Sequence, residues 1–144
     1  LCPGAPFESQ PMRAAAVLTA LLASALPVLA EGPVTADQFE AHVTGKTLTY
    51  ARGGAIFGIE QYLPGRKVRW QFTADTCQYG SWYPKEGGLI CFLYEYDTRE
   101  HCWTFRMVAG RLTAQSADDL AGAELAEVEQ TAQGLACPGP DVGV

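Results

Sequence analysis

Cys91, His101 and Cys102, in the stretch GGLICFLYEYDTREHCWTF, are residue types that could do chemistry together. A cysteine beside a histidine can form a nucleophile with its base, and the three side chains could ligate a metal. Neighbouring residues of a strand point to opposite faces, however, so His101 could not reach Cys102. We therefore predict neither a catalytic residue nor a metal site here, and expect the cysteines to form disulfides.

The part of the chain that we expect to be exported contains an even number of cysteines: Cys77, Cys91, Cys102 and Cys137. Such a set is typical of two disulfides, for which three pairings exist. Strand alternation places the first three on one outer face, which slightly favours Cys91–Cys102 with Cys77–Cys137. A turn centred on residues 98–99 would instead put Cys91 opposite Arg106 and leave Cys102 to bond Cys137. Either way, the loop closed by Cys137 should stabilise most, by about 3 to 4 kcal/mol in the chain-entropy model.

Glu60, Glu95 and Asp97 are the carboxylates that could act as general acid or base. A turn centred on residues 64–65 would place Glu60 on the outer face opposite Arg69, where such a pair contributes roughly 0.2 to 1 kcal/mol. Glu95 and Asp97 belong to a hairpin tip, where carboxylates are usually solvated. No Ser-His-Asp order and no glycine-rich phosphate loop stands out. We predict no cofactor.

The N-terminal segment is typical of a secretory signal, because Met12 and Arg13 precede an apolar run that ends in small residues at Ala30. The run is shorter than the roughly 20 residues of a membrane-spanning helix. We therefore expect residues 1–30 to be upstream sequence and signal peptide, and residues 31–144 to form one periplasmic or secreted domain without a membrane span. The net charge of −6, with no basic run, argues against nucleic acid as a partner.

A short helix should follow Thr35, with Gln38 three residues later as its capping-box partner and Val34 and Phe39 as a hydrophobic staple. It should end near Gly45. From residue 46 the period changes to two, and six or seven strands separated by turn residues predict an antiparallel meander. The segment 116–135 is either a C-terminal helix or contains a last strand over residues 125–131.

The meander should carry one aromatic face. The turn in PKEGG would bring Trp82 against Ile90, and the same face continues through Phe92 and Tyr94. A twisted sheet must cover such a face, either by curling into a small barrel or half-barrel or by packing a helix across it. We thus predict a mainly β, disulfide-bonded domain with a short N-terminal helix.

The number of large aromatic residues is high for so short a chain, and core packing explains most of them. A barrel mouth lined by rings could also hold a small apolar or planar ligand. The candidate ligand-binding residues are Trp70, Trp82, Tyr94 and Trp103.

Four motifs support a family resemblance: G-S-W at residues 80–82, G-L-I-C-F-L-Y at 88–94, C-W at 102–103, and the ending C-P-G-P-D-V-G from Cys137. From about Lys46 onward the chain resembles a group of small exported proteins, mostly from alphaproteobacteria, classed as a domain of unknown function. The resemblance implies an exported, disulfide-bonded β domain and transfers no catalytic residue.

The leading functional hypothesis is a non-enzymatic periplasmic β domain that binds a small ligand or another envelope protein. Two alternatives remain. The hairpin tip at residues 97–100 could present itself to a protein target as an inhibitor, or the domain could be a small hydrolase-like enzyme that uses Glu60 or Glu95.

Overall fold

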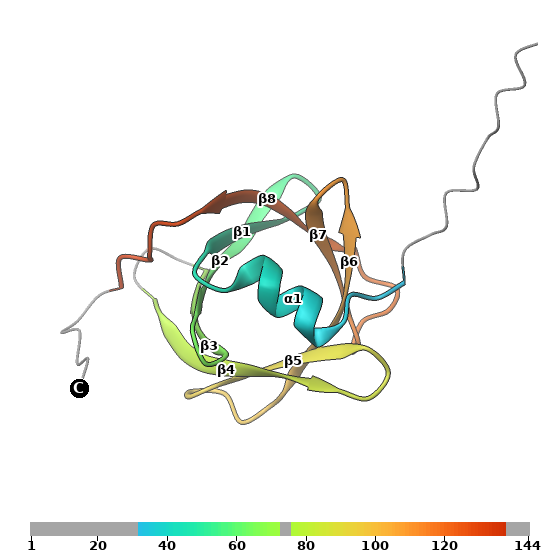
Figure 1. Ribbon diagram of the computed structural model, residues 1–144, viewed down its shortest axis with the longest axis horizontal. Helices are drawn as coiled ribbons and strands as arrows, with labels where there is room; N and C mark the ends of the chain where they lie inside the picture. Colours follow the sequence, from blue (N-terminus) through green and yellow to red (C-terminus); the bar gives the residue numbers. More distant parts are fainter. Residues whose placement is uncertain (1–31, 73–75, 138–144) are drawn as a thin grey trace, which may run out of the picture.

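Eight antiparallel strands follow one another around a closed barrel, because the last strand pairs with the first (Figure 1). The computed structural model describes residues 32–72 and 76–137, so the predicted signal segment 1–30 lies outside the described residues. The strands are β1 (Thr47–Arg52), β2 (Ala55–Leu63), β3 (Lys67–Gln71), β4 (Gln78–Lys85), β5 (Leu89–Tyr94), β6 (His101–Val108), β7 (Arg111–Ser116) and β8 (Leu125–Thr131). The predicted β fold is confirmed, with eight strands where six or seven were expected.

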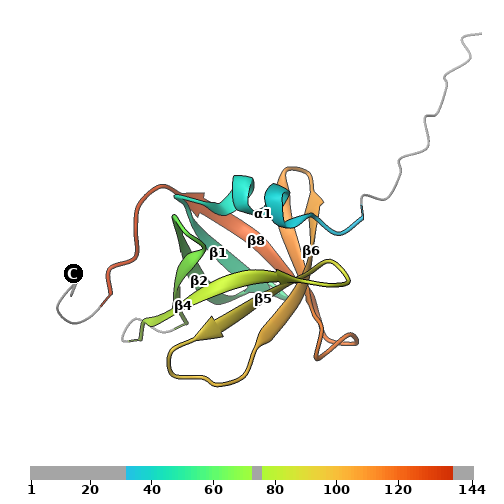
Figure 2. The ribbon, with the colours of Figure 1, turned by 60° about the horizontal axis from the view of Figure 1, so that its bottom comes forward.

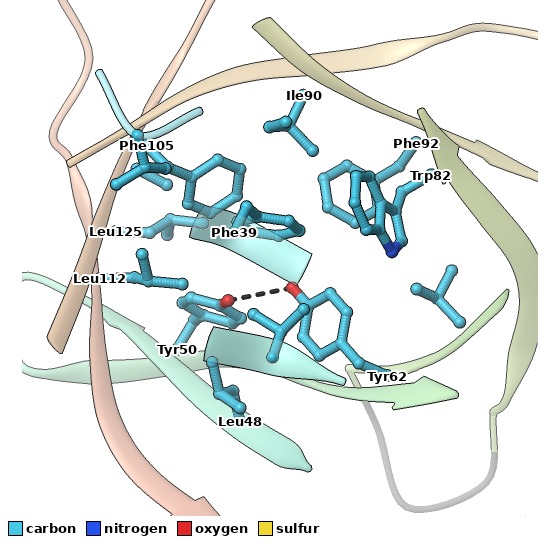
Figure 3. Packing of buried hydrophobic residues seen from close by; sticks show 14 residues of the cluster. Phe39, Leu48, Tyr50, Tyr62, Trp82, Ile90, Phe92, Phe105, Leu112 and Leu125 are labelled. Carbon is cyan, nitrogen blue, oxygen red and sulfur yellow. Dashed lines mark hydrogen bonds between the residues drawn. The ribbon is translucent and has the colours of Figure 1, made fainter. Parts of the chain in front are cut away.

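A short helix, α1 (Ala36–Val43), lies across one end of the barrel (Figures 1 and 2). The predicted capping box is present: the Thr35 hydroxyl accepts from the backbone N–H of Gln38, and the Gln38 side chain accepts from the backbone N–H of Thr35. Phe39 is fully buried at the centre of the apolar core (Figure 3). Its ring contacts four rings from β2, β4, β5 and β6, with centroids 4.6 to 6.4 Å away: Tyr62, Trp82, Phe92 and Phe105. The helix therefore closes this end with an apolar plug.

A buried carboxylate on β8 also ties α1 to the barrel wall. Glu127 Oε2 accepts from the backbone N–H of Leu112 at 2.8 Å and lies 2.9 Å from Nε2 of His42. Its Oε1 accepts from the Gln130 side chain at 3.1 Å. Four groups thus meet at the helix end of the barrel, and the His42 side chain is mostly covered there.

The pairing of β2 with β3 differs by one residue from the predicted register. Glu60 lies opposite Trp70, and Arg69 lies opposite Gln61. The connection is a three-residue loop, in which Gly65 and Arg66 both have positive φ, and not a turn centred on residues 64–65. Because a one-residue slip exchanges the two faces of a strand, Glu60 points into the barrel and the expected outer-face pair with Arg69 is wrong.

The β4–β5 hairpin is shifted by two residues from the prediction, since Trp82 lies opposite Phe92 and not Ile90. A two-residue slip preserves the faces, so all three side chains still belong to the core. In the next hairpin Cys91 lies directly opposite Cys102.

Both disulfides have the favoured pairing, Cys91–Cys102 and Cys77–Cys137. The alternative with Cys91 opposite Arg106 and Cys102 bonded to Cys137 is wrong. The longer bridge joins residues 60 apart in sequence and connects the start of β4 to the chain after β8.

Of the two alternatives for residues 116–135, the strand is the one that forms. In β8 the buried Leu125 and Glu127 alternate with the exposed Ala126 and Val128, a period of two. β1 and β7 both hydrogen-bond to β8, so this strand supplies the pairing partners that close the ring.

Candidate binding cavity

A cavity of about 260 Å³ occupies the barrel interior beyond the plug. All eight strands contribute to its lining, and eight of the fourteen lining side chains are aromatic: Tyr50, Phe57, Tyr62, Trp70, Phe92, Tyr94, Trp103 and Phe105. A cavity of roughly 150 Å³ already admits benzene. This one is therefore large enough for a molecule with one or two rings.

The cavity extends to the barrel end opposite α1. The helix packs over the β2–β3 loop, where Arg66 bonds Glu40, and in a meander the β5–β6 connection lies at the other end. That connection supplies Asp97 to the lining, and the start of β6 supplies His101. Both side chains are about one-third exposed, so they form a polar rim.

Glu60 is the most deeply buried acidic group of the cavity, at 2% exposed. The Tyr94 hydroxyl, from β5, lies 3.0 and 3.2 Å from its two carboxylate oxygens and donates to them. Burial raises the pKa of Glu60 well above its ordinary value, and the hydrogen bond from Tyr94 opposes this shift only in part. Glu60 is therefore harder to ionise than an exposed glutamate.

Two tyrosine hydroxyls meet between the cavity and the core. Tyr50 from β1 and Tyr62 from β2 lie with their oxygens 3.0 Å apart, as the dashed line in Figure 3 shows. Burial raises the pKa of both hydroxyls, so both stay protonated. The pair carries two hydrogens and uses one in its mutual bond, which leaves one to donate to a bound molecule.

Two inward-facing glycines make room for two of the cavity rings. A Cβ atom on Gly58 would lie 2.2 Å from the Trp70 ring, and one on Gly80 would lie 2.8 Å from the Tyr94 ring. The ladder shows a bulge next to the first: Tyr50 pairs with Gly58 and the following residue pairs with Ile56, which leaves Phe57 unpaired. A bulge redirects side chains, and the Phe57 ring lines the cavity 5.7 Å from Trp70.

The rim contains an acid and a base in contact. Asp97 Oδ2 lies 2.6 Å from Nε2 of His101, and its Oδ1 accepts from the backbone N–H of Arg99 at 3.0 Å. These two bonds, the one from the Arg99 backbone first, lower the pKa of Asp97. Asp97, expected at a solvated hairpin tip, keeps about one-third of its side chain exposed and also lines the cavity.

Three of the four predicted ligand-binding residues, Trp70, Tyr94 and Trp103, line the cavity together. Trp82 does not line it: this side chain is 2% exposed, packs against Phe39, and lies under the Arg66 guanidinium. It belongs to the plugged end of the barrel.

Sequence reasoning missed Glu60, His101 and Phe57 as part of the cavity wall. The spacing of Asp97 and His101, four residues apart across a hairpin tip, was a signal that could have revealed their contact. The position of Glu60 depended on the loop that sets the register, and that of Phe57 on a bulge.

The outer face beside the cavity holds a second polar cluster, with Glu100 between Tyr83 and Lys85. The Glu100 carboxylate raises the pKa of Tyr83 to about 12. Glu100 also lies close to the sulfurs of Cys91 and Cys102, but these are bonded to each other, so the group does not offer two thiolates to a metal.

Among the residues that the structure describes, no helix has the length and apolar character needed to cross a membrane. No protein-family model, curated protein or solved structure matches this chain.

Proposed function

We propose that this domain is a non-enzymatic binding protein of the periplasm or extracellular space, which holds a small aromatic ligand inside the barrel. The observation that carries the proposal is the ring-lined cavity of about 260 Å³. Cavities that bind small molecules combine apolar walls with a few convergent polar groups, here Glu60, Tyr94 and the Tyr50–Tyr62 pair. We also propose that the domain is a member of the group of small exported alphaproteobacterial proteins that its motifs resemble.

The two disulfides support a location outside the cytoplasm, because such bonds persist in oxidising compartments and are rare elsewhere. They also suit a barrel whose interior contains a cavity. A cavity removes packing contacts, and cross-links compensate by restricting the unfolded chain.

The alternatives have less support. Glu95, one of the two carboxylates considered for hydrolysis, is exposed and does not line the cavity. An inhibitor would present the tip at residues 97–100 to its target. Within this chain, however, Asp97 bonds His101 and Glu100 bonds Lys85, so both acidic side chains of the tip already have partners.

Tryptophan fluorescence tests the proposal, because the three tryptophans have different positions. Trp70 and Trp103 line the cavity, whereas Trp82 lies in the core outside it. Titration with neutral aromatic probes such as 2-phenylethanol should change the emission of the wild-type protein and of Trp82→Phe in the same way. Trp70→Phe should lose a large part of that change.

A probe that changes emission equally in all three proteins would contradict binding in this cavity. The absence of any response to a set of one-ring and two-ring probes, with no shift in melting temperature, would contradict the binding function itself.

A further inference from the structure

Charge is unevenly distributed over the cavity wall. Among the described residues that line it are the carboxylates of Glu60 and Asp97 and the imidazole of His101, but no lysine or arginine. Asp97 has His101 as its partner at 2.6 Å. Glu60 forms no ion pair with any described residue, and its hydrogen-bond partner is the neutral Tyr94 hydroxyl. The more deeply buried carboxylate is therefore uncompensated.

The ionised form of such a carboxyl is unfavourable in an apolar wall, because its lost hydration is not replaced. Tyr94 can donate one hydrogen, whereas the two carboxylate oxygens of Glu60 offer about four acceptor sites. A cation that entered the cavity would supply both the missing charge and the missing donors.

The rings next to Glu60 suit the same kind of ligand. Trp70 lies opposite Glu60 in the β2–β3 ladder, Phe57 packs against Trp70, and Tyr94 bonds the carboxylate itself. Aromatic faces carry negative potential and attract ammonium groups, most strongly where water is excluded. The same rings can bury the hydrocarbon part of a ligand.

We infer that the cavity binds a small aromatic amine, whose ammonium group pairs with Glu60 and whose ring packs among the cavity aromatics. This inference rests on the proposed binding function and names its ligand class. An arylalkylamine with one or two rings suits a cavity of about 260 Å³. The chain's net charge of −6 favours the approach of a cation.

Glu60 is the most deeply buried carboxyl group of the cavity wall, and its neighbours come from several strands. Tyr94 from β5, Tyr62 from β2 and Tyr50 from β1 stay neutral, because burial raises the pKa of each hydroxyl. Trp70, opposite on β3, does not titrate. Glu127 on β8 accepts from the backbone N–H of Leu112 and contacts His42, and the rim residues Asp97 and His101 bond each other.

Amine binding should therefore release a proton. Burial raises the pKa of Glu60, so the carboxyl stays protonated in the empty cavity to higher pH than an exposed glutamate would. An ammonium group requires the ionised form and displaces that proton. Amine affinity should increase with pH until Glu60 is ionised in the empty protein or the amine itself loses its charge.

Calorimetry with 2-phenylethylamine and 2-phenylethanol tests the inference, since these probes differ only in ammonium against hydroxyl. The proteins are the wild type, Glu60→Gln, and the matched control Glu95→Gln, which makes the same change at an exposed site. We expect the wild type and the control to prefer the amine by about tenfold or more, and Glu60→Gln to lose that preference while it still binds the alcohol. Titrations in two buffers of different ionisation enthalpy should show proton release in the wild type.

The outcomes separate the two proposals. Equal affinities for amine and alcohol would overturn the amine inference and leave the binding function standing, whereas binding of neither probe would overturn both. If Glu60→Gln does not fold, a pH series on the wild type and on His101→Gln decides, because the second protein lacks the other cavity group that can take up a proton in this range. Amine affinity that increases with pH supports the ion pair, and affinity that decreases with pH, without proton release, would mean that a neutral Glu60 donates to its ligand.

Discussion

Replacing Phe39 with alanine should remove the plug that α1 inserts into the barrel. The Phe39 ring is fully buried and lies within 6.4 Å, centroid to centroid, of four other rings. Buried Phe→Ala substitutions cost about 3 to 5 kcal/mol, and the energy of aromatic pairs adds to the area term. We expect a loss of about 4 kcal/mol, a large part of the roughly 5 to 15 kcal/mol that stabilises a domain.

Urea unfolding followed by circular dichroism measures this loss. Phe72→Ala is the matched control, because it deletes the same side chain at a site that is 54% exposed. The control should lose less than about 1 kcal/mol. Its urea midpoint should therefore stay close to that of the wild type.

A loss below about 1.5 kcal/mol for Phe39→Ala would refute the plug, because removal of a fully buried phenylalanine ring should cost at least about 3 kcal/mol. An equal loss in both variants would likewise show that the helix does not close the barrel.

Three further predictions concern the cavity and its cross-links. Glu60→Gln should gain stability relative to the wild type as pH increases from about 5 to 8. The folded chain holds the Glu60 proton more tightly than the unfolded chain does, so ionisation above the ordinary pKa of 4.5 destabilises the wild type but not the variant. Urea unfolding of both proteins at each pH measures the difference in the free energy of unfolding. Loss of the long disulfide in Cys77→Ala with Cys137→Ala should cost about 4 kcal/mol, because the bridged residues are 60 apart, and the change in urea midpoint measures it. Gly58→Ala should displace the Trp70 ring, since the new Cβ would lie 2.2 Å from it, and should shift tryptophan emission and weaken the binding of neutral probes.

Each of these has a contradicting result. A stability difference between Glu60→Gln and the wild type that does not change with pH would place Glu60 in water. An unchanged urea midpoint without the long disulfide would mean that the chain after β8 does not restrict the unfolded state. Unaltered emission in Gly58→Ala would show that Trp70 does not pack on β2.

Local signals predicted the parts of the fold that depend on neighbouring residues. The Thr35–Gln38 capping box needs only residues three apart, and the strands follow from a period of two. Shared faces and an even cysteine count were enough to favour the Cys91–Cys102 and Cys77–Cys137 pairs.

The position of Glu60 could not be predicted in the same way. A three-residue loop with Gly65 and Arg66 at positive φ sets the β2–β3 register, and one residue more or less in such a loop moves Glu60 between solvent and cavity. Periodicity gives the faces of a strand relative to each other, but it does not say which face is inside when both carry large residues.

The sequence by itself determined a disulfide-bonded, mainly β domain with one capped helix and an aromatic face, because these features depend on short-range spacing and residue type. Only the tertiary structure decided that the strands number eight and close, that α1 fills one end, and that Trp70, Tyr94 and Trp103 meet around Glu60 at the other. Closure depends on the pairing of β1 with β8, which are far apart in sequence. Phe39 fills one end of the barrel from a helix outside the sheet, and no local pattern specifies how far its ring reaches into the interior.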